Sequence, residues 1–123
     1  MKLKLLNEAF SVCKVCDFSE VNLEDKFVFI SKTDEELSLV CLTETVPNNV
    51  LKRDDGWKAI RIQGELDFSL IGILSKISTI LANNKIGIFA ISTYNTDYIL
   101  IKEQNCIAAV QALTANGYEV DNR

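Results

Sequence analysis

The chain has 123 residues and a mass of 13.8 kDa, and 48% of its residues are hydrophobic, which is enough for one folded domain or two closely packed small halves. The formal charge of −4 and the isoelectric point near 4.8, with no run of lysine or arginine, argue against nucleic acid or an anionic membrane as the main partner. No apolar stretch reaches transmembrane length and the first residues lack a signal-peptide pattern, so we expect a cytoplasmic protein without membrane attachment.

The N-terminal part of the chain predicts mainly strands. Residues 2–15 are rich in apolar side chains and favour a strand or a bent pair of strands, with a break at Asn7 and Glu8. Residues 17–26 favour a short helix or a turn. Residues 27–31 and 37–42 predict a hairpin around a polar turn. Residues 43–56 contain the only proline, Pro47, and we interpret them as a linker that ends a degenerate N-terminal half, residues 1–56.

Residues 57–123 predict a complete α+β unit. A strand over 57–63 precedes a helix with Asp67 or Ser69 as N-cap and Asn83 and Asn84 at its end. Strands over 85–93 and 98–102 follow, then a second helix that Asn105 caps and Gly117 ends, and a last strand over 118–120. The apolar faces of the two helices are predicted to be Leu70, Ile73, Leu74, Ile77, Ile80 and Leu81 in the first, and Ile107, Val110 and Leu113 in the second.

The order βαββαβ is that of the ferredoxin-like fold, with four antiparallel strands and both helices on one face of the sheet. The chain contains a short internal repeat. Ile30-Ser31 and Leu39-Val40 of the first half precede Ile91-Ser92 and Leu100-Ile101 of the second half by 61 residues. We therefore expect tandem ferredoxin-like halves. The strands of the second half are apolar on both faces, so the face without helices needs cover from the other half or from a second chain.

The four cysteines are expected to be free thiols in a cytoplasmic protein. Cys13 and Cys16 have the CxxC spacing of redox and zinc sites. The chain has no histidine to complete a zinc site, and residues three apart in a strand point to opposite faces. Buried structural cysteine is therefore the favoured interpretation, and we predict no metal and no cofactor.

The sequence offers little for catalysis. The absence of histidine excludes Ser-His-Asp and Cys-His catalysis in their usual forms, and no glycine-rich phosphate loop is present. The acidic pairs Glu35/Glu36 and Asp54/Asp55 fall in polar segments that suit solvated loops. We predict no catalytic residue and a protein that is not an enzyme.

Two segments combine into a candidate binding site. GELDFSLIGIL, residues 64–74, predicts a strand that runs through a tight turn into a helix, where free backbone N–H groups can bind an anion. IFAISTYNTDYILI, residues 88–101, predicts two strands around a short turn. Together the two segments resemble the ACT domain, and more narrowly the small tandem-ACT proteins related to CASTOR-type amino-acid sensors and to the regulatory regions of aspartate kinases.

The resemblance implies a regulatory module that binds an amino acid at an interface between ACT units. It implies that the loop and helix start at residues 65–72 face the second strand, residues 88–93. The backbone N–H groups of three residues at the helix start would bind the ligand carboxylate, Gly72 would allow close approach, and Asp67 or Asp97 could pair with an ammonium group. The site residues so implied are Asp67, Phe68, Ser69, Leu70, Gly72, Phe89, Ala90, Ile91, Ser92 and Thr93.

Each of these residues also has a purely structural interpretation. Asp67 and Ser69 can serve only as helix caps, Asp97 and Asn95 as turn formers, and Phe89 and Ile91 as core. We expect a homodimer and a separate, unidentified enzyme as the regulated partner. The alternatives are an ACT-fold assembly module without a working binding site and, less favoured, a small enzyme that depends on Asp67.

Overall fold

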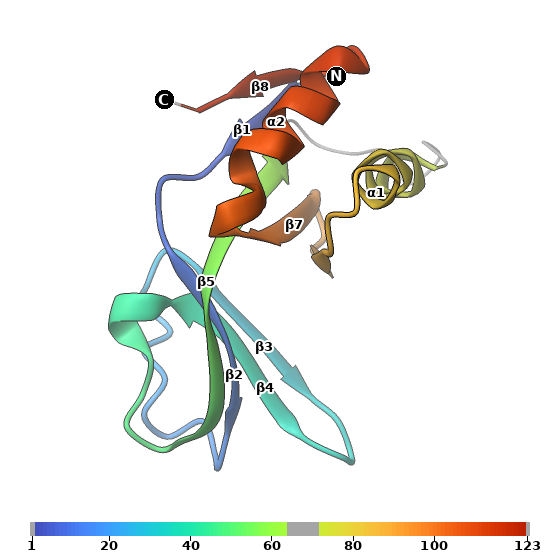
Figure 1. Ribbon diagram of the computed structural model, residues 1–123. Helices are drawn as coiled ribbons and strands as arrows, with labels where there is room; N and C mark the ends of the chain where they lie inside the picture. The colour runs from blue at the N-terminus through green and yellow to red at the C-terminus, as the bar shows by residue number, and fades with distance from the viewer. Residues whose placement is uncertain (1, 64–71, 123) are drawn as a thin grey trace. The chain divides into compact units, whose positions relative to one another are not determined.

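The computed structural model describes residues 2–63 and 72–122, and the chain divides into two compact units (Figure 1). The N-terminal unit comprises residues 8–57, and the C-terminal unit comprises residues 1–7 and 58–123. The expected boundary between residues 56 and 57 falls next to this division, but it assigned residues 1–7 to the wrong half. They belong to the C-terminal unit because they pair with its strands.

The N-terminal unit is a four-stranded antiparallel sheet within the described residues. Its strands are β2 (Phe10–Val15), β3 (Val28–Lys32), β4 (Leu37–Leu42) and the first part of β5 (Val50–Ile62), in the order β3-β4-β2-β5. Counted from β2, this is the strand order of a ferredoxin-like fold. The predicted hairpin of β3 and β4 is confirmed. Turns occupy residues 17–26, and the short 3₁₀ helix η1 (Thr43–Thr45) follows β4.

The prediction that residues 43–56 form a linker is wrong for its second half. Strand β5 begins at Val50 and continues through the charged run of residues 52–55. Pairing with β2 supplies the backbone hydrogen bonds, while the charged side chains stay exposed. The register of this pair shifts between Phe10 and Val12, opposite Gly56, whose φ of +86° suits a glycine bulge. Tertiary pairing has therefore overridden the loop-like composition.

The C-terminal unit has a five-stranded sheet in the described part of the chain, in the order β6-β7-β5-β1-β8. Besides β5 its strands are β1 (Lys2–Leu5), β6 (Phe89–Ser92), β7 (Asp97–Lys102) and β8 (Glu119–Asp121). The prediction of four antiparallel strands in this unit therefore lacked a fifth strand, β1. Strand β1 lies between the first and last strands of the ferredoxin-like unit, antiparallel to β5 and parallel to β8.

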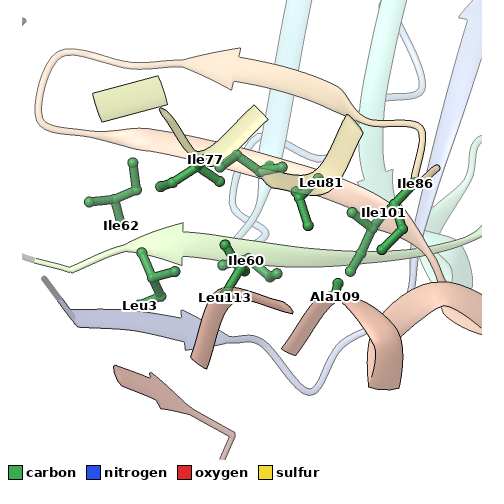
Figure 2. Close-up of a cluster of buried hydrophobic side chains, with 10 residues drawn as sticks. Leu3, Ile60, Ile62, Ile77, Leu81, Ile86, Ile101, Ala109 and Leu113 are labelled. Atoms are coloured by element: carbon green, nitrogen blue, oxygen red, sulfur yellow. The ribbon is translucent and has the colours of Figure 1, made fainter. Parts of the chain in front are cut away.

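Two helices, α1 (Ile73–Asn83) and α2 (Cys106–Ala115), pack with the sheet around one hydrophobic core. The 3₁₀ helix η2 (Glu103–Asn105) leads into α2. Figure 2 shows Ile77 and Leu81 of α1 and Leu113 of α2 directed towards side chains of the strands. No described helix is both long enough and apolar enough to cross a membrane. The core consists of Leu3, Ile60, Ile62, Ile77, Leu81, Ile86, Ile99, Ile101, Ala109 and Leu113.

The helix ends follow the sequence signals, but one face does not. Asn84 is the C-cap of α1, and Gly117, with a φ of +91°, follows the C-cap of α2 as predicted. Asn105 is the N-cap of α2 but makes no side-chain capping bond. Ile107 is 76% exposed, so its place in the apolar face is wrong. The buried residues of α2 are Ala109 and Leu113, which are four residues apart and so lie on one face of the helix. Ile107 is two residues from Ala109 and therefore lies off that face.

Candidate functional site

The candidate site lies where β5 ends beside the turn between β6 and β7. In that turn the backbone N–H of Thr93 donates to the carbonyl oxygen of Thr96 at 2.8 Å, and the Thr93 hydroxyl donates to the same oxygen at 2.9 Å. The Thr96 side chain is nearly buried, and its hydroxyl donates to the carbonyl oxygen of Ile62 at 2.6 Å. These bonds fix the turn to the end of β5.

A pocket of about 350 Å³ opens at this junction. That volume suits an amino-acid-sized ligand, since small-molecule sites begin at about 300 Å³. Thr93 is the one predicted site residue among the described residues that line it. The described lining residues are Arg61, Ile62, Gln63, Thr93, Asn95, Thr96 and Tyr98.

Arg61 is the only charged residue among the described lining residues. Its Nε donates to Oε1 of Gln63 at 2.9 Å, and its guanidinium carbon lies 5.8 Å from the centre of the Tyr98 ring. The second distance is within the range of a cation–π contact. Gln63 and Tyr98 thus hold the guanidinium group from two sides.

The register of β6 and β7 separates the predicted residues of β6 into two faces. Phe89 is opposite Leu100 and Ile91 is opposite Tyr98, so Phe89 and Ile91 share the face of Tyr98. Both side chains are half-buried. Ala90 and Ser92 project from the other face and are exposed. Only the first pair is therefore on the same face of the sheet as Arg61.

Four predicted residues, Asp67, Phe68, Ser69 and Leu70, lie outside the described residues. The fifth predicted residue at the helix start, Gly72, is the N-cap of α1, with a φ of +83°, and its carbonyl accepts from the N–H of Lys76 at 2.8 Å. The prediction of Asp67 or Ser69 as N-cap is therefore wrong. The helical spacing of apolar residues predicts a start one turn before Ile73. The left-handed backbone of Gly72 sets the N-terminal end of α1, so the helix begins at Ile73.

This start also changes which backbone groups are available to a ligand. The first N–H groups of a helix have no intrahelical partner, and in α1 these are the groups of residues 73–75. The prediction assigned that role to Phe68, Ser69 and Leu70. Those three residues lie outside the described residues, so their role stays a prediction.

Arg61 and Gln63 are the residues that the sequence prediction missed. The alternation of the strand over 57–63 contained the signal. Ile60 and Ile62 are core residues, so Arg61 and Gln63 must project from the opposite face, immediately before the turn. Asp97, which was predicted as a possible partner of an ammonium group, is not among the described residues that line the pocket. It directly precedes Tyr98 in β7, so its side chain projects from the other face of the sheet.

The cysteines are free thiols as expected, but the prediction of buried structural cysteine is confirmed for Cys13 and wrong for Cys16. All four are free thiols; Cys13 and Cys41 are buried in the core of the N-terminal unit, and Cys16 is exposed. Cys13 and Cys16 therefore do not converge. The pKa of Cys41 is raised to about 11, mainly by burial and in smaller part by the neighbouring Cys13 thiol. Burial also raises the pKa of Cys13. No cluster of metal-binding side chains occurs in residues 2–63 and 72–122.

Comparison with known protein families identifies the class. The family model described as ACT domain matches residues 52–115, and a separate model of an N-terminal domain matches residues 8–49. The first match covers more than half of the chain and agrees with the observed α+β architecture. This protein belongs to the ACT domain family.

Solved structures agree with that assignment. A protein from Agrobacterium tumefaciens is 32% identical, with a TM-score of 0.85 over 99% of this chain and 92% of that one. The regulatory subunit of aspartate kinase from Thermus thermophilus, in a ligand-free form, has a TM-score of 0.60 at 10% identity, over 92% of this chain and 95% of that one. A structure of aspartokinase α and β subunits has a TM-score of 0.65 at 17% identity, over 94% and 96% of the two chains. The last two establish the resemblance to aspartate kinase regulatory domains in fold.

Proposed function

We propose that this chain is a non-catalytic regulatory protein that binds an amino acid through its C-terminal unit. The observation that carries the proposal is the pocket beside Thr93, in a chain that belongs to the ACT domain family. A cation, two amides and hydroxyl groups meet there, which is the set of groups that recognises a small polar molecule. The similarity in fold to a regulatory subunit of aspartate kinase supports the same reading.

The proposed protein works as a homodimer, with the ligand bound where the C-terminal unit of one copy meets that of the other. Strand β6 suits the pairing edge, because its residues Phe89–Ser92 carry no charge and no proline to oppose pairing with another strand. Binding would favour one packing of the two copies over another and so regulate a separate enzyme. The four free thiols support the proposed cytoplasmic location.

The test is thermal unfolding of the protein in the presence of each common amino acid. A ligand that binds only the folded state adds about 2.7 kcal/mol of stability at a hundredfold excess over its dissociation constant. We expect one or a few amino acids to raise the midpoint, and the substitution Asp67→Ala to reduce the shift if the segment before α1 contributes. No shift with any amino acid would contradict the proposal and favour an assembly module without a working site.

Light scattering at several protein concentrations, with and without the stabilising amino acid, tests the dimer. The proposal expects a mass of two chains and a change in dissociation when the ligand is added. Introducing a charge at the centre of the edge, in Ala90→Lys, should weaken the dimer. Ile30→Lys in β3 introduces the same charge at an exposed position of the N-terminal unit; it is the matched control and should leave the mass unchanged.

A further inference from the structure

The pocket beside Thr93 contains Arg61, and the position of this arginine indicates which chemical group of a ligand the pocket would bind. The guanidinium group of Arg61 has five N–H donors, and one of them, on Nε, is used by Gln63. The donors on the two terminal nitrogens form the fork that binds a planar carboxylate by two parallel hydrogen bonds.

The neighbours of Arg61 fix the direction of that fork. The Gln63 amide oxygen holds Nε at 2.9 Å, and the Tyr98 ring lies under the group at 5.8 Å. A guanidinium group restrained on two sides loses less conformational entropy when it binds a ligand. The hydroxyl groups of Thr93 and Thr96 are engaged within the turn and with Ile62, so they shape the pocket wall.

The arginine of the pocket favours a planar anion. Arg61 is cationic and the other described lining residues are neutral. Lys4 lies directly opposite Arg61 in the register of β1 and β5, so charge alone does not distinguish a carboxylate from a phosphate. Shape does, because a carboxylate has the planar geometry that the guanidinium fork binds by two parallel hydrogen bonds.

We propose that Arg61 binds a free carboxylate group of the ligand, so that the pocket accepts amino acids and small carboxylic acids but rejects their amides and esters. This proposal rests on the proposed function and specifies the chemical class that the same site recognises. Asn95 and the amide of Gln63 complete the polar wall. Loss of the carboxylate would leave the arginine fork unpaired in the bound state, which is why the neutral analogue should be rejected.

The first measurement is calorimetric titration with the common amino acids and, for each one that binds, its carboxamide. We expect the carboxamide to bind at least tenfold more weakly. Arg61→Gln should weaken binding of the amino acid at least tenfold and remove the preference over the carboxamide. Lys14→Gln is the control, because it removes a positive charge from an exposed position of β2 in the N-terminal unit, away from the described pocket lining.

The second measurement uses the unaltered protein and is independent of any loss of stability in the variant. The NMR signal of the Arg61 Nε–H group should shift when an amino acid or succinate is added, and not when inorganic phosphate is added at the same ionic strength. A larger shift with phosphate would overturn the choice of carboxylate. An unchanged Arg61 signal with every carboxylate would overturn the proposal.

These outcomes separate the inference from the proposed function. If an amino acid binds equally well to the unaltered protein and to Arg61→Gln, the inference is wrong and amino-acid binding stands. If succinate shifts the Arg61 signal but no amino acid binds, the carboxylate site stands and the proposed amino-acid function fails.

Discussion

Thr33 and Thr93 hold the same position in two copies of one hairpin, 60 residues apart. The backbone N–H of Thr33 donates to the carbonyl oxygen of Glu36 at 3.0 Å, as that of Thr93 does to Thr96 at 2.8 Å. The following elements correspond at the same spacing, because β4 and η1 span residues 37–42 and 43–45, and β7 and η2 span residues 97–102 and 103–105. The two units are thus built on one plan.

This correspondence corrects the expected repeat by one residue. A spacing of 61 pairs Ile30 with Ile91, whereas the turns and strands align at 60. In a strand a shift of one residue exchanges the two faces, so the difference matters for every side chain. The true spacing pairs Phe29 with Phe89, which are opposite Val40 and Leu100 in their hairpins.

The pair of threonines provides a matched test of the pocket. Thr33→Val and Thr93→Val each remove a hydroxyl that bonds the turn, with Thr33 Oγ1 accepting from Glu35 at 3.1 Å and Thr93 Oγ1 donating at 2.9 Å. We expect each substitution to lower the free energy of unfolding by about 1 kcal/mol in urea titrations. Only Thr93→Val should also weaken amino-acid binding, because only Thr93 lines the pocket next to Arg61. Equal weakening by both substitutions would contradict a local role for Thr93.

Local sequence signals predicted the hairpins and the C-terminal ends of the helices. Gly117 and Asn84 end their helices, and the β-branched and aromatic residues of 27–31, a polar turn and the apolar residues of 37–42 predicted β3 and β4. The pairing of β1 with both β5 and β8 was not predictable in the same way. Its partners lie more than fifty residues away, and a strand pattern carries no record of its neighbours.

The site was only partly predictable for a related reason. Thr93 was predicted because the ACT resemblance implies that residues 88–93 face the ligand, and it lines the pocket described above. Arg61 was not predicted because the ACT resemblance implies a ligand at the helix start and the second strand, and not on the polar face of the strand before that helix. The position of an arginine over a tyrosine ring depends on which strands are neighbours, and that follows from the whole fold.

Strand β1 should be essential to the C-terminal unit. Leu3 is fully buried in the core beside Ile60 and Ile62, so Leu3→Ala leaves a cavity and should lower the free energy of unfolding by about 2–5 kcal/mol. Lys2→Ala, on the exposed side of the same strand, should change it by less than about 0.5 kcal/mol. Urea titration monitored by circular dichroism measures both. A small effect of Leu3→Ala would mean that β1 detaches easily and that the sheet does not depend on it.

The buried thiol of Cys41 should make the protein sensitive to alkaline pH. Its pKa is raised from 9.0 to about 11, mainly by burial, so the folded state holds the proton where the unfolded state has lost it. This group leaves stability unchanged below about pH 9, and stability then falls by up to about 1.4 kcal/mol per pH unit as the pH rises towards about 11.

Cys41→Ala separates this effect from the titration of lysine and tyrosine, which both proteins share. The variant should be less stable at neutral pH because it lacks a buried sulfur atom, yet lose less stability between about pH 8 and about pH 11. Urea titrations at a series of pH values give the two slopes. Parallel slopes would show that Cys41 does not titrate with a raised pKa.

The bulge in β5 requires glycine, and the chain contains a control for that requirement. Gly56 has a φ of +86° and Gly87 has no positive φ, while an added Cβ would meet no atom within 4 Å at either position. Gly56→Ala should therefore destabilise through backbone conformation alone, by about 1–2 kcal/mol. Gly87→Ala should be neutral or stabilise by up to about 1 kcal/mol, because it restricts the unfolded chain. Thermal and urea unfolding compare the two variants. If Gly56→Ala is as stable as Gly87→Ala, β5 does not need the left-handed residue, and pairing with β2 persists without a glycine bulge.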